Sequence, residues 1–313
     1  MSMRRVIKSV VGLVCILSII SYADVFSIDA SSPSTSKVAP ADLLAAGPIV
    51  HVPQLNIGLV QGDELDALSA GLDIVTKSDI VYFSVDRTSG GIVGPAYPYD
   101  VAGQSFLGQQ AGDIFITMDQ NFVQNVPQGL NYLGVNQNAF GLVPAGAQGF
   151  PDQQYSGPMD NLDAYSMEEF DFNRDGVPDV PVYFSLAAGS PTLTALNASP
   201  ADILVWDPIT GAISIKFSAL QLGLSVADDI DALALNVNPA GLGVYFSLAN
   251  RQRADIFYSD LISGTSSVAY SAAQLGLNVN DNVDALETNA AVPEPITIGL
   301  FGFVAFAVLK RKK

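Results

Sequence analysis

A nine-residue stretch rich in oxygen-bearing side chains has the spacing that hard cations require. It runs from Asp171 to Asp179 with the sequence DFNRDGVPD. Carboxylate or amide oxygens stand at its first, third, fifth and ninth positions, a backbone carbonyl is available at the seventh, and glycine at the sixth allows the sharp turn. A polar turn without a metal is the alternative. The predicted calcium ligands are Asp171, Asn173, Asp175, Val177 and Asp179.

Pairs of aspartates three residues apart recur four times, each within the pattern Asp-x-apolar-Asp-Ala. Paired carboxylates could perform the acid and base steps of glycoside hydrolysis, or collect cations at equivalent points of a ring. They could also accept backbone N–H bonds in a turn before a strand. We favour this structural role, because a residue repeated in every unit usually serves the fold. The pairs are Asp63 and Asp66, Asp160 and Asp163, Asp228 and Asp231, and Asp281 and Asp284.

These pairs belong to a longer internal repeat. Residues 218–233 (SALQLGLSVADDIDAL) and 271–286 (SAAQLGLNVNDNVDAL) match at 11 of 16 positions. A Tyr-Phe-Ser element follows three of the pairs, and an Asp before two apolar residues comes after it. The copies of these two elements begin at Tyr82 and Asp113, at Tyr183 and Asp202, and at Tyr245 and Asp255. The constant order indicates one repeated unit, with insertions at 119–159 and 165–180 in the first two copies.

Each unit is predicted to contain about four short strands, because aromatic and β-branched runs alternate with Gly, Asn, Pro and Asp. Four-stranded units of about 50 residues are typical of β-propeller blades. We therefore predict an all-β, propeller-like repeat domain at 48–291. It has three full units and a closing unit to which 49–59 and 283–288 contribute the last and the first strand. A three-unit prism and an open β-solenoid are alternatives. The last full unit has predicted strands at 232–237, 243–248, 255–259 and 266–270.

The predicted calcium loop leads directly into a strand at 182–186. Its twelfth position is Val182 rather than the Glu of an EF-hand. In these respects the loop resembles the calcium loop of FG-GAP repeats in integrin-type propellers, where nine residues suffice and a strand follows. The resemblance is confined to the loop and the strand after it, and it implies calcium bound within a blade. The other units do not carry the wider FG-GAP pattern.

Composition excludes several classes of function. The 313 residues include one cysteine and one histidine, His51, so neither a disulfide framework nor a Cys/His zinc site is expected. Catalysis by a Ser-His-Asp or Cys-His set would depend on His51 alone. The net charge of −17 argues against nucleic acid as a partner, because nucleic-acid binding needs a basic face.

Residues 1–47 are predicted to lie outside the repeat domain. Residues 1–23 have the features of a signal peptide: three early basic residues, an apolar run at 10–20 and small residues before a cleavage site after Ala23. An uncleaved membrane anchor is the alternative. Residues 24–47 contain a Ser/Thr/Pro-rich run and are predicted to be a disordered linker.

The C-terminal segment, 292–313, has three parts in a specific order. A Val-Pro-Glu-Pro motif precedes an apolar run at 296–309, and four basic residues end the chain. The apolar part would span roughly 21 Å as a helix, less than the ~30 Å of a bilayer core, and the basic end favours the cytoplasmic side. This order resembles the PEP-CTERM sorting signal, and an ordinary short tail anchor is the alternative. The motif residues are Val292, Pro293, Glu294 and Pro295.

The PEP-CTERM resemblance implies an address and a processing enzyme. An exosortase-type enzyme would act near the motif, and until then the C-terminal helix would hold the chain in the membrane. The implied location is secreted or at the cell surface of a Gram-negative-type bacterium that makes exopolysaccharide and biofilm.

The region between the two terminal signals supports a matrix role. Residues 24–291 hold 7 basic and 30 acidic residues, a net charge of −23, and a surface protein with this charge is expected to use calcium. We therefore predict a non-enzymatic, calcium-stabilised protein associated with extracellular polysaccharide. A carbohydrate-binding module of that matrix is the first alternative. A glycan-active enzyme that uses a carboxylate pair is the second.

Overall fold

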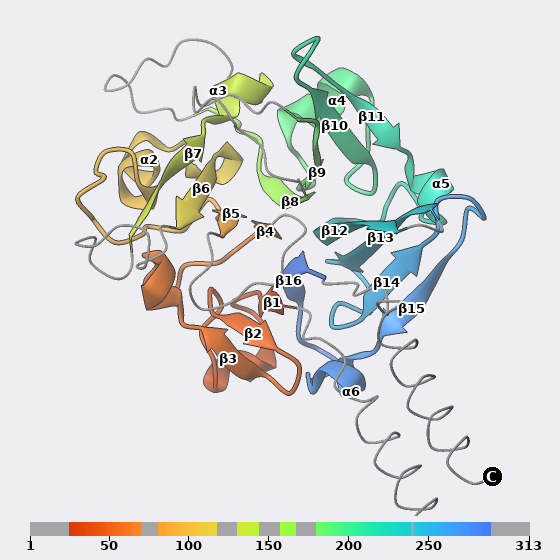
Figure 1. Ribbon diagram of the computed structural model, residues 1–313, viewed down its shortest axis with the longest axis horizontal. Coiled ribbons are helices and arrows are strands. Elements are labelled where there is room, and N and C mark those ends of the chain that lie inside the picture. Colours follow the sequence, from red (N-terminus) through yellow and green to blue (C-terminus); the bar gives the residue numbers. More distant parts are fainter. Residues whose placement is uncertain are drawn as a thin grey trace, which may run out of the picture. The chain divides into compact units, whose positions relative to one another are not determined.

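Four sheets, each of four antiparallel strands, surround a common axis in the computed structural model (Figure 1). The structure describes residues 25–69, 81–117, 130–143, 157–166, 180–238 and 241–288. The innermost strands of the four sheets contact one another, including those of opposite sheets. The predicted all-β, propeller-like fold with a shared closing unit is confirmed.

Three blades are each formed by consecutive strands, ordered from the axis outward. Blade 1 contains β4 (Ala67–Ser69), β5 (Tyr82–Ser84), β6 (Ile114–Thr117) and β7 (Asn131–Val135). Blade 2 contains β8 (Leu162–Ser166), β9 (Val182–Leu186), β10 (Ile203–Asp207) and β11 (Ala212–Phe217). Blade 3 contains β12 (Ile230–Asn238), β13 (Gly241–Leu248), β14 (Ile256–Ser259) and β15 (Ser266–Tyr270). In blade 1, β7 lies within the segment that we interpreted as an insertion, because its sequence NYLGV carries no repeat signature.

Blade 4 joins segments from near both ends of the chain. Its strands, from the axis outward, are β16 (Val283–Glu287), β1 (Val25–Ile28), β2 (Leu43–Ala45) and β3 (Ile49–Val52). Two of the four come from 24–47, so the prediction of a disordered linker there is wrong. The serine-rich run forms the short helix η1 (Pro33–Ser36) in the β1–β2 connection. It is held in place because the Ser34 backbone N–H and Oγ both donate to Asp281, at 2.9 and 2.6 Å.

A short helical turn follows the outer strand of every blade and leads to the next one. The four turns are η2 (Gln54–Ile57), α3 (Gln137–Phe140), α5 (Ala219–Leu222) and α6 (Ala272–Leu275). Each is followed by a glycine with φ between 73 and 79°, a left-handed conformation that ends the helix. The remaining helices lie in connections between second and third strands: α2 (Val101–Leu107), η3 (Gln110–Gly112) and α4 (Pro191–Leu196).

The hydrophobic core lies between blades rather than within one of them. Four clusters of buried side chains each combine residues from two neighbouring blades. In one of them Phe246 of blade 3 stacks on Phe257, with ring centroids 5.7 Å apart, beside Ile203 of blade 2. Neighbouring blades therefore depend on each other for burial of their apolar faces.

A repeated serine connects each blade to the next by a hydrogen bond. The serine ends the Phe-Ser pair of the second strand, and its Oγ donates to a carbonyl at the start of the next blade's inner strand. All four serines are fully buried. The bonds run from Ser27 to Leu65, Ser84 to Leu162, Ser185 to Ile230 and Ser247 to Val283, at 2.7–3.2 Å. The four bonds form a closed cycle, so the repeat positions the residue after each carbonyl, an aspartate, in the same way in every blade.

Candidate functional site: an axial ring of aspartates

Two of the predicted sites lie outside the described residues. These are the calcium loop, Asp171, Asn173, Asp175, Val177 and Asp179, and the sorting motif, Val292, Pro293, Glu294 and Pro295. The signal peptide at 1–23 lies outside them as well. The eight repeated aspartates are all described, and the structure separates them into two sets.

The first aspartate of each pair lies in the turn before the inner strand, and we call these four the turn aspartates. Each accepts a backbone N–H from the preceding turn and one or more bonds from the connection between the second and third strands of its own blade. Asp160, for example, accepts from Val143 N at 2.6 Å and from Thr192 N and Oγ1 at 3.0 and 2.6 Å. Asp63 accepts from Val60, Gly90 and Gly91, Asp281 from Asn278 and Ser34, and Asp228 from Ser225 and Arg251. These carboxylates therefore hold two loops of one blade together.

The second aspartate of each pair lies at the axial end of the blade, and we call these four the axial ring. The members are Asp66, Asp163, Asp231 and Asp284, each following the carbonyl that accepts the repeated serine. All four are at least nine-tenths buried. Sequence spacing alone did not distinguish these residues from the turn aspartates.

Side chains of neighbouring blades reach two members of the ring. Asn161 Nδ2 of blade 2 donates to Asp66 Oδ2 of blade 1 at 2.8 Å. In the same way, Asn282 Nδ2 of blade 4 donates to Asp231 Oδ2 of blade 3. At the other two seams, the residue after the turn aspartate is acidic, Glu64 or Asp229. The ring therefore has amide donors at alternate seams and acids at the others.

No protein-family model and no curated protein matches this chain. The site is therefore interpreted from its own geometry.

Burial and mutual repulsion dominate the electrostatics of the ring. Burial raises the pKa of Asp231 to about 8, and the bond from Asn282 only partly offsets this. Burial and repulsion from Asp231 raise the pKa values of Asp163 and Asp284 well above the usual range. The pKa of Asp66 shifts in the same direction through burial and the charge of Asp86. Because a buried carboxylate loses its hydration, a neutral, protonated form is favoured at these positions.

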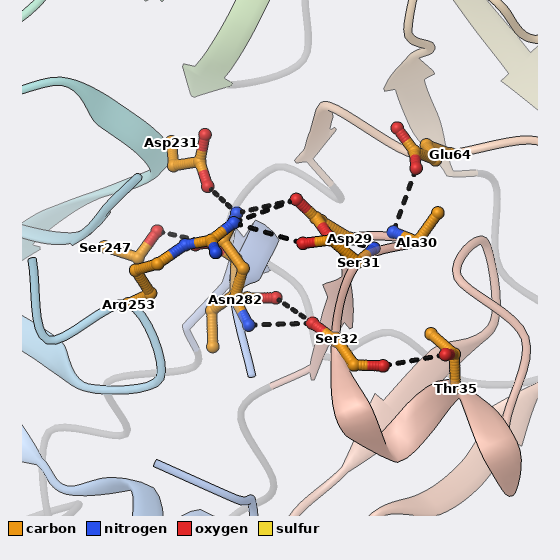
Figure 2. Close-up of polar contacts among 11 residues, drawn as sticks. Asp29, Ala30, Ser31, Ser32, Thr35, Glu64, Asp231, Ser247, Arg253 and Asn282 are labelled. Carbon is orange, nitrogen blue, oxygen red and sulfur yellow. Dashed lines mark hydrogen bonds and ion pairs between the residues drawn. The ribbon is translucent and has the colours of Figure 1, made fainter. Parts of the chain in front are cut away.

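The closing blade adds a polar contact between segments that lie far apart in the sequence (Figure 2). Arg253, in the β13–β14 connection, donates from Nη2 to Asp29 Oδ2 at 3.1 Å and from Nε to Asn282 Oδ1 at 3.2 Å. Asn282 N also donates to Ser32 Oγ at 2.8 Å. Arg253 thus connects blade 3 to both the first and the last parts of blade 4. Neither Arg253 nor Asp29 belongs to a repeated element, which is why sequence reasoning missed them.

A third set of aspartates, at the start of each third strand, holds the helical turns. Asp202 Oδ1 accepts from Ala219 N at 2.6 Å, and Asp202 Oδ2 accepts from Ser199 N at 2.7 Å. Asp113 Oδ1 accepts from Gln137 N at 2.8 Å, but its Oδ2 is buried without a partner among the described residues, and burial raises its pKa to about 8. Asp42 and Asp255 make the equivalent bonds to Gln54 and Ala272. The recurrence of this aspartate was visible in the sequence, but its role was not.

Two other kinds of site are absent from the part of the chain that the structure describes. Within the described ranges, no three His, Cys, Asp or Glu residues are arranged so as to hold a metal ion. No helix among these residues is long and apolar enough to span a membrane.

Proposed function

We propose that this protein is a non-enzymatic secreted or cell-surface protein, sorted by an exosortase-type enzyme and associated with the extracellular polysaccharide matrix. The observation that carries the proposal is the order of the parts within residues 292–313. The apolar run after the Pro-Glu-Pro motif is too short for a stable anchor, and a basic end follows it. Such a segment would hold the chain in the membrane only until it is cleaved near the motif.

The charge and the scaffold support this proposal. Between the two terminal signals the chain carries a net charge of −23, which keeps it soluble and makes its contact with acidic polysaccharide depend on cations. The turn aspartates, which could have formed catalytic pairs, accept bonds from the loops that they connect. Asp160, for instance, accepts from Val143 in its preceding turn and from Thr192 in its own blade, and these bonds use both of its carboxylate oxygens.

Processing at the motif is tested by replacing Pro293, Glu294 and Pro295 with alanine. The wild-type and variant chains are expressed in a host with an exosortase and in the same host without it. We expect wild-type protein to lose its basic end, by mass spectrometry, and to reach the medium or the cell surface in the first host alone. The variant is expected to stay in the membrane fraction in both. Release of the variant at the wild-type rate would contradict the proposal.

Calcium is the second part of the proposal, carried by the spacing of residues 171–179 and by the strand β9 that follows them. Thermal unfolding in calcium and in EDTA tests it, with Asp175→Ala as the matched variant. A site held at 100 times its dissociation constant adds ~2.7 kcal/mol. For a domain of this size, that is roughly 5–11 °C in melting temperature. We expect this shift in the wild type and not in Asp175→Ala. Equal melting curves with and without calcium would remove calcium from the proposal.

A carbohydrate-binding module is the second candidate, and exposed aromatic side chains on blade 1 favour it. Tyr97, Tyr99 and Phe106 are 46, 51 and 66% exposed in and beside the helix α2. The backbone there is firmly held: Asp100 caps α2 by accepting from Gly103 N at 2.8 Å, and an added Cβ at Gly103 would lie 2.1 Å from Pro98 O. Exposed rings on a held backbone offer apolar faces to a ligand.

A pull-down with purified matrix polysaccharide separates the two candidates. The test variant replaces Tyr97, Tyr99 and Phe106 with alanine, and the control replaces the exposed Ile209 and Ile262. Retention that is lost in the aromatic variant and kept in the control supports a glycan site. Equal retention of both variants assigns any binding to charge and cations instead.

A further inference from the structure

The axial ring concentrates buried acid at one place in the fold. The inner strands β4, β8, β12 and β16 contact one another across the axis as well as around it. Each ring aspartate occupies the same position of the repeat, at the inner strand of its blade. Their charges act on each other: Asp284 is affected by Asp231 and Asp66, and Asp163 by the same two residues.

Among the described residues, side-chain amides donate one hydrogen bond to each of two ring members. Asp66 receives one bond from Asn161, and Asp231 receives one from Asn282. At the seam of Asp284 the equivalent residue is Glu64, which accepts from the backbone N–H of Ala30. At the seam of Asp163 it is Asp229, which accepts from the backbone N–H of Ala188. Asp284 Oδ2 is buried without a partner among the described residues. The amide oxygen of Asn161 is also buried without a hydrogen-bond partner among the described residues.

Charged groups around the ring do not compensate for the missing donors. The acidic groups that act on it are Asp29, Glu64, Asp86 and Asp229, and the basic ones are Arg87 and Arg253. Arg253 already bonds to Asp29 and Asn282. In the part of the chain that the structure describes, the groups that act most strongly on the ring are thus more often acidic than basic. Ionising these buried carboxyl groups would therefore cost more desolvation free energy than their favourable contacts supply.

We propose that the axial ring is a proton-holding device. The blades close around protonated carboxyl groups at the seams that lack an asparagine, and loss of these protons as the pH rises loosens the contact between blades. A proton on each of these carboxyl groups removes a buried negative charge that no asparagine amide among the described residues reaches. The ring thereby makes the stability of the propeller depend on pH.

The direction of the effect follows from proton binding. The folded chain binds protons at the ring up to a higher pH than the unfolded chain, in which an aspartate releases its proton near pH ~4. Because burial raises the pKa values of Asp163 and Asp284 well above the usual range, the folded state binds more protons above this pH. The stabilisation is therefore complete in acid and is lost as the pH rises. Each excess proton multiplies the unfolding equilibrium constant by about tenfold per pH unit.

Urea unfolding of the full-length chain between pH 5 and 9, with EDTA throughout, tests this proposal. The test variant is Asp163→Asn with Asp284→Asn, and the control is Asp260→Asn, which removes one charge from an exposed turn. We expect the wild type and the control to unfold more readily at each step toward pH 9. In the double variant, the rise of the unfolding equilibrium constant per pH unit should be at least tenfold smaller than in the wild type. The double variant should also be more stable than the wild type at pH 8–9.

Equal pH dependence of the double variant and the wild type would overturn the proposal. So would restoration of wild-type stability at pH 9 by calcium, in an Asp175→Ala background, since the ring would then hold a cation. EDTA and the Asp175→Ala substitution both prevent calcium binding at 171–179 from affecting this measurement. If the ring proposal is contradicted, the proposed function therefore still stands.

A second measurement covers the case in which the double variant does not fold. The infrared carbonyl band of protonated carboxyl groups is recorded for the folded wild type at pH 7. The same band is recorded for Asp113→Asn, because Asp113 is another buried carboxyl group. Persistence of the band in that variant, and its loss toward pH 9, supports protons on the ring. Absence of the band in folded Asp113→Asn at pH 7 contradicts them.

Discussion

The turn aspartates and the axial ring are three residues apart in every repeat, yet they occupy opposite environments. Asp228 accepts a backbone N–H and two guanidinium bonds, and Arg251 lowers its pKa. Asp231, three residues along the same chain, has its pKa raised to about 8 by burial. The surroundings that the fold supplies, a guanidinium partner for one carboxyl group and burial for the other, therefore shift the two pKa values in opposite directions. One repeat therefore contains both a structural anion and a group that favours a proton.

The largest expected effect comes from replacing one aspartate of a pair at a time with asparagine. Asp160→Asn places an amide NH₂ where the carboxylate accepts three bonds from Val143 and Thr192, and should lower the unfolding free energy by about 2–4 kcal/mol. Asp163→Asn, in the ring, should be neutral or stabilising at pH 8. Urea unfolding at that pH measures both. Similar losses in the two variants would abolish the distinction between the sets.

A pH-dependent effect is expected at Asp113, the third-strand aspartate whose Oδ2 has no donor among the described residues. Its pKa of about 8 means that the stability it contributes falls as the pH rises from ~4 toward 8, by at most about 1.4 kcal/mol per unit. Asp113→Asn should remove this part of the slope in urea titrations.

The matched variant at the equivalent site is Asp202→Asn. Because both oxygens of Asp202 accept backbone bonds, this variant should lose stability. An unchanged slope in Asp113→Asn would show that this carboxyl group is ionised in the fold.

A smaller effect is expected from hydroxyl groups that donate to the turn aspartates. Thr192→Val removes the 2.6 Å bond to Asp160, and Ser34→Ala removes the equivalent 2.6 Å bond to Asp281 in blade 4. Each should cost about 1 kcal/mol, by thermal or urea unfolding. Since the two positions are equivalent in the repeat, a large difference between them would mean that the closing blade depends on its serine more than the others.

The smallest effect is expected at the Arg251–Asp228 ion pair, where the arginine side chain is 43% exposed. Arg251→Gln should cost about 0.5–1 kcal/mol at pH 7 and low salt, because solvent screens exposed pairs. Asp228 has a lowered pKa, so this stability is present above the usual aspartate pKa and is lost as the pH falls through the folded value. Melting curves at pH 7, at low and high salt and again in acid, should show the difference shrinking. A difference that persists in acid would assign the effect to packing of the arginine.

Much of the fold was predictable because the repeat is carried by residues that make one contact many times. The Phe-Ser pair, the turn aspartate and the third-strand aspartate each make the same kind of contact in all four blades, so their recurrence in the sequence indicated one repeated unit. The first strands of blade 4 escaped prediction for a specific reason. Phe26-Ser27 and Asp42-Leu43-Leu44 repeat the signatures of the other blades, but the serine-rich connection between them resembles a linker in composition.

The candidate site was less predictable, because its contacts cross between blades. The acids and amides at 64, 161, 229 and 282 are adjacent to the turn aspartates in sequence, yet Asn161 and Asn282 act on the ring aspartate of the preceding blade. Such a pairing depends on the angle between neighbouring sheets, which no local pattern contains. The spacing alone therefore left catalytic, metal-binding and structural interpretations of the pairs open.

Closure of blade 4 has a consequence for the order in which the protein can form. Strand β16 pairs with β1, although the two stand at opposite ends of the described chain. Strands β1 to β3 precede the other three blades in the described chain, and their axial edge stays unpaired until Val283–Glu287 has been made. Contacts this distant in sequence form slowly, since a long loop must close before they contribute. Blade 4 therefore closes only after the other three blades of the described chain have been made.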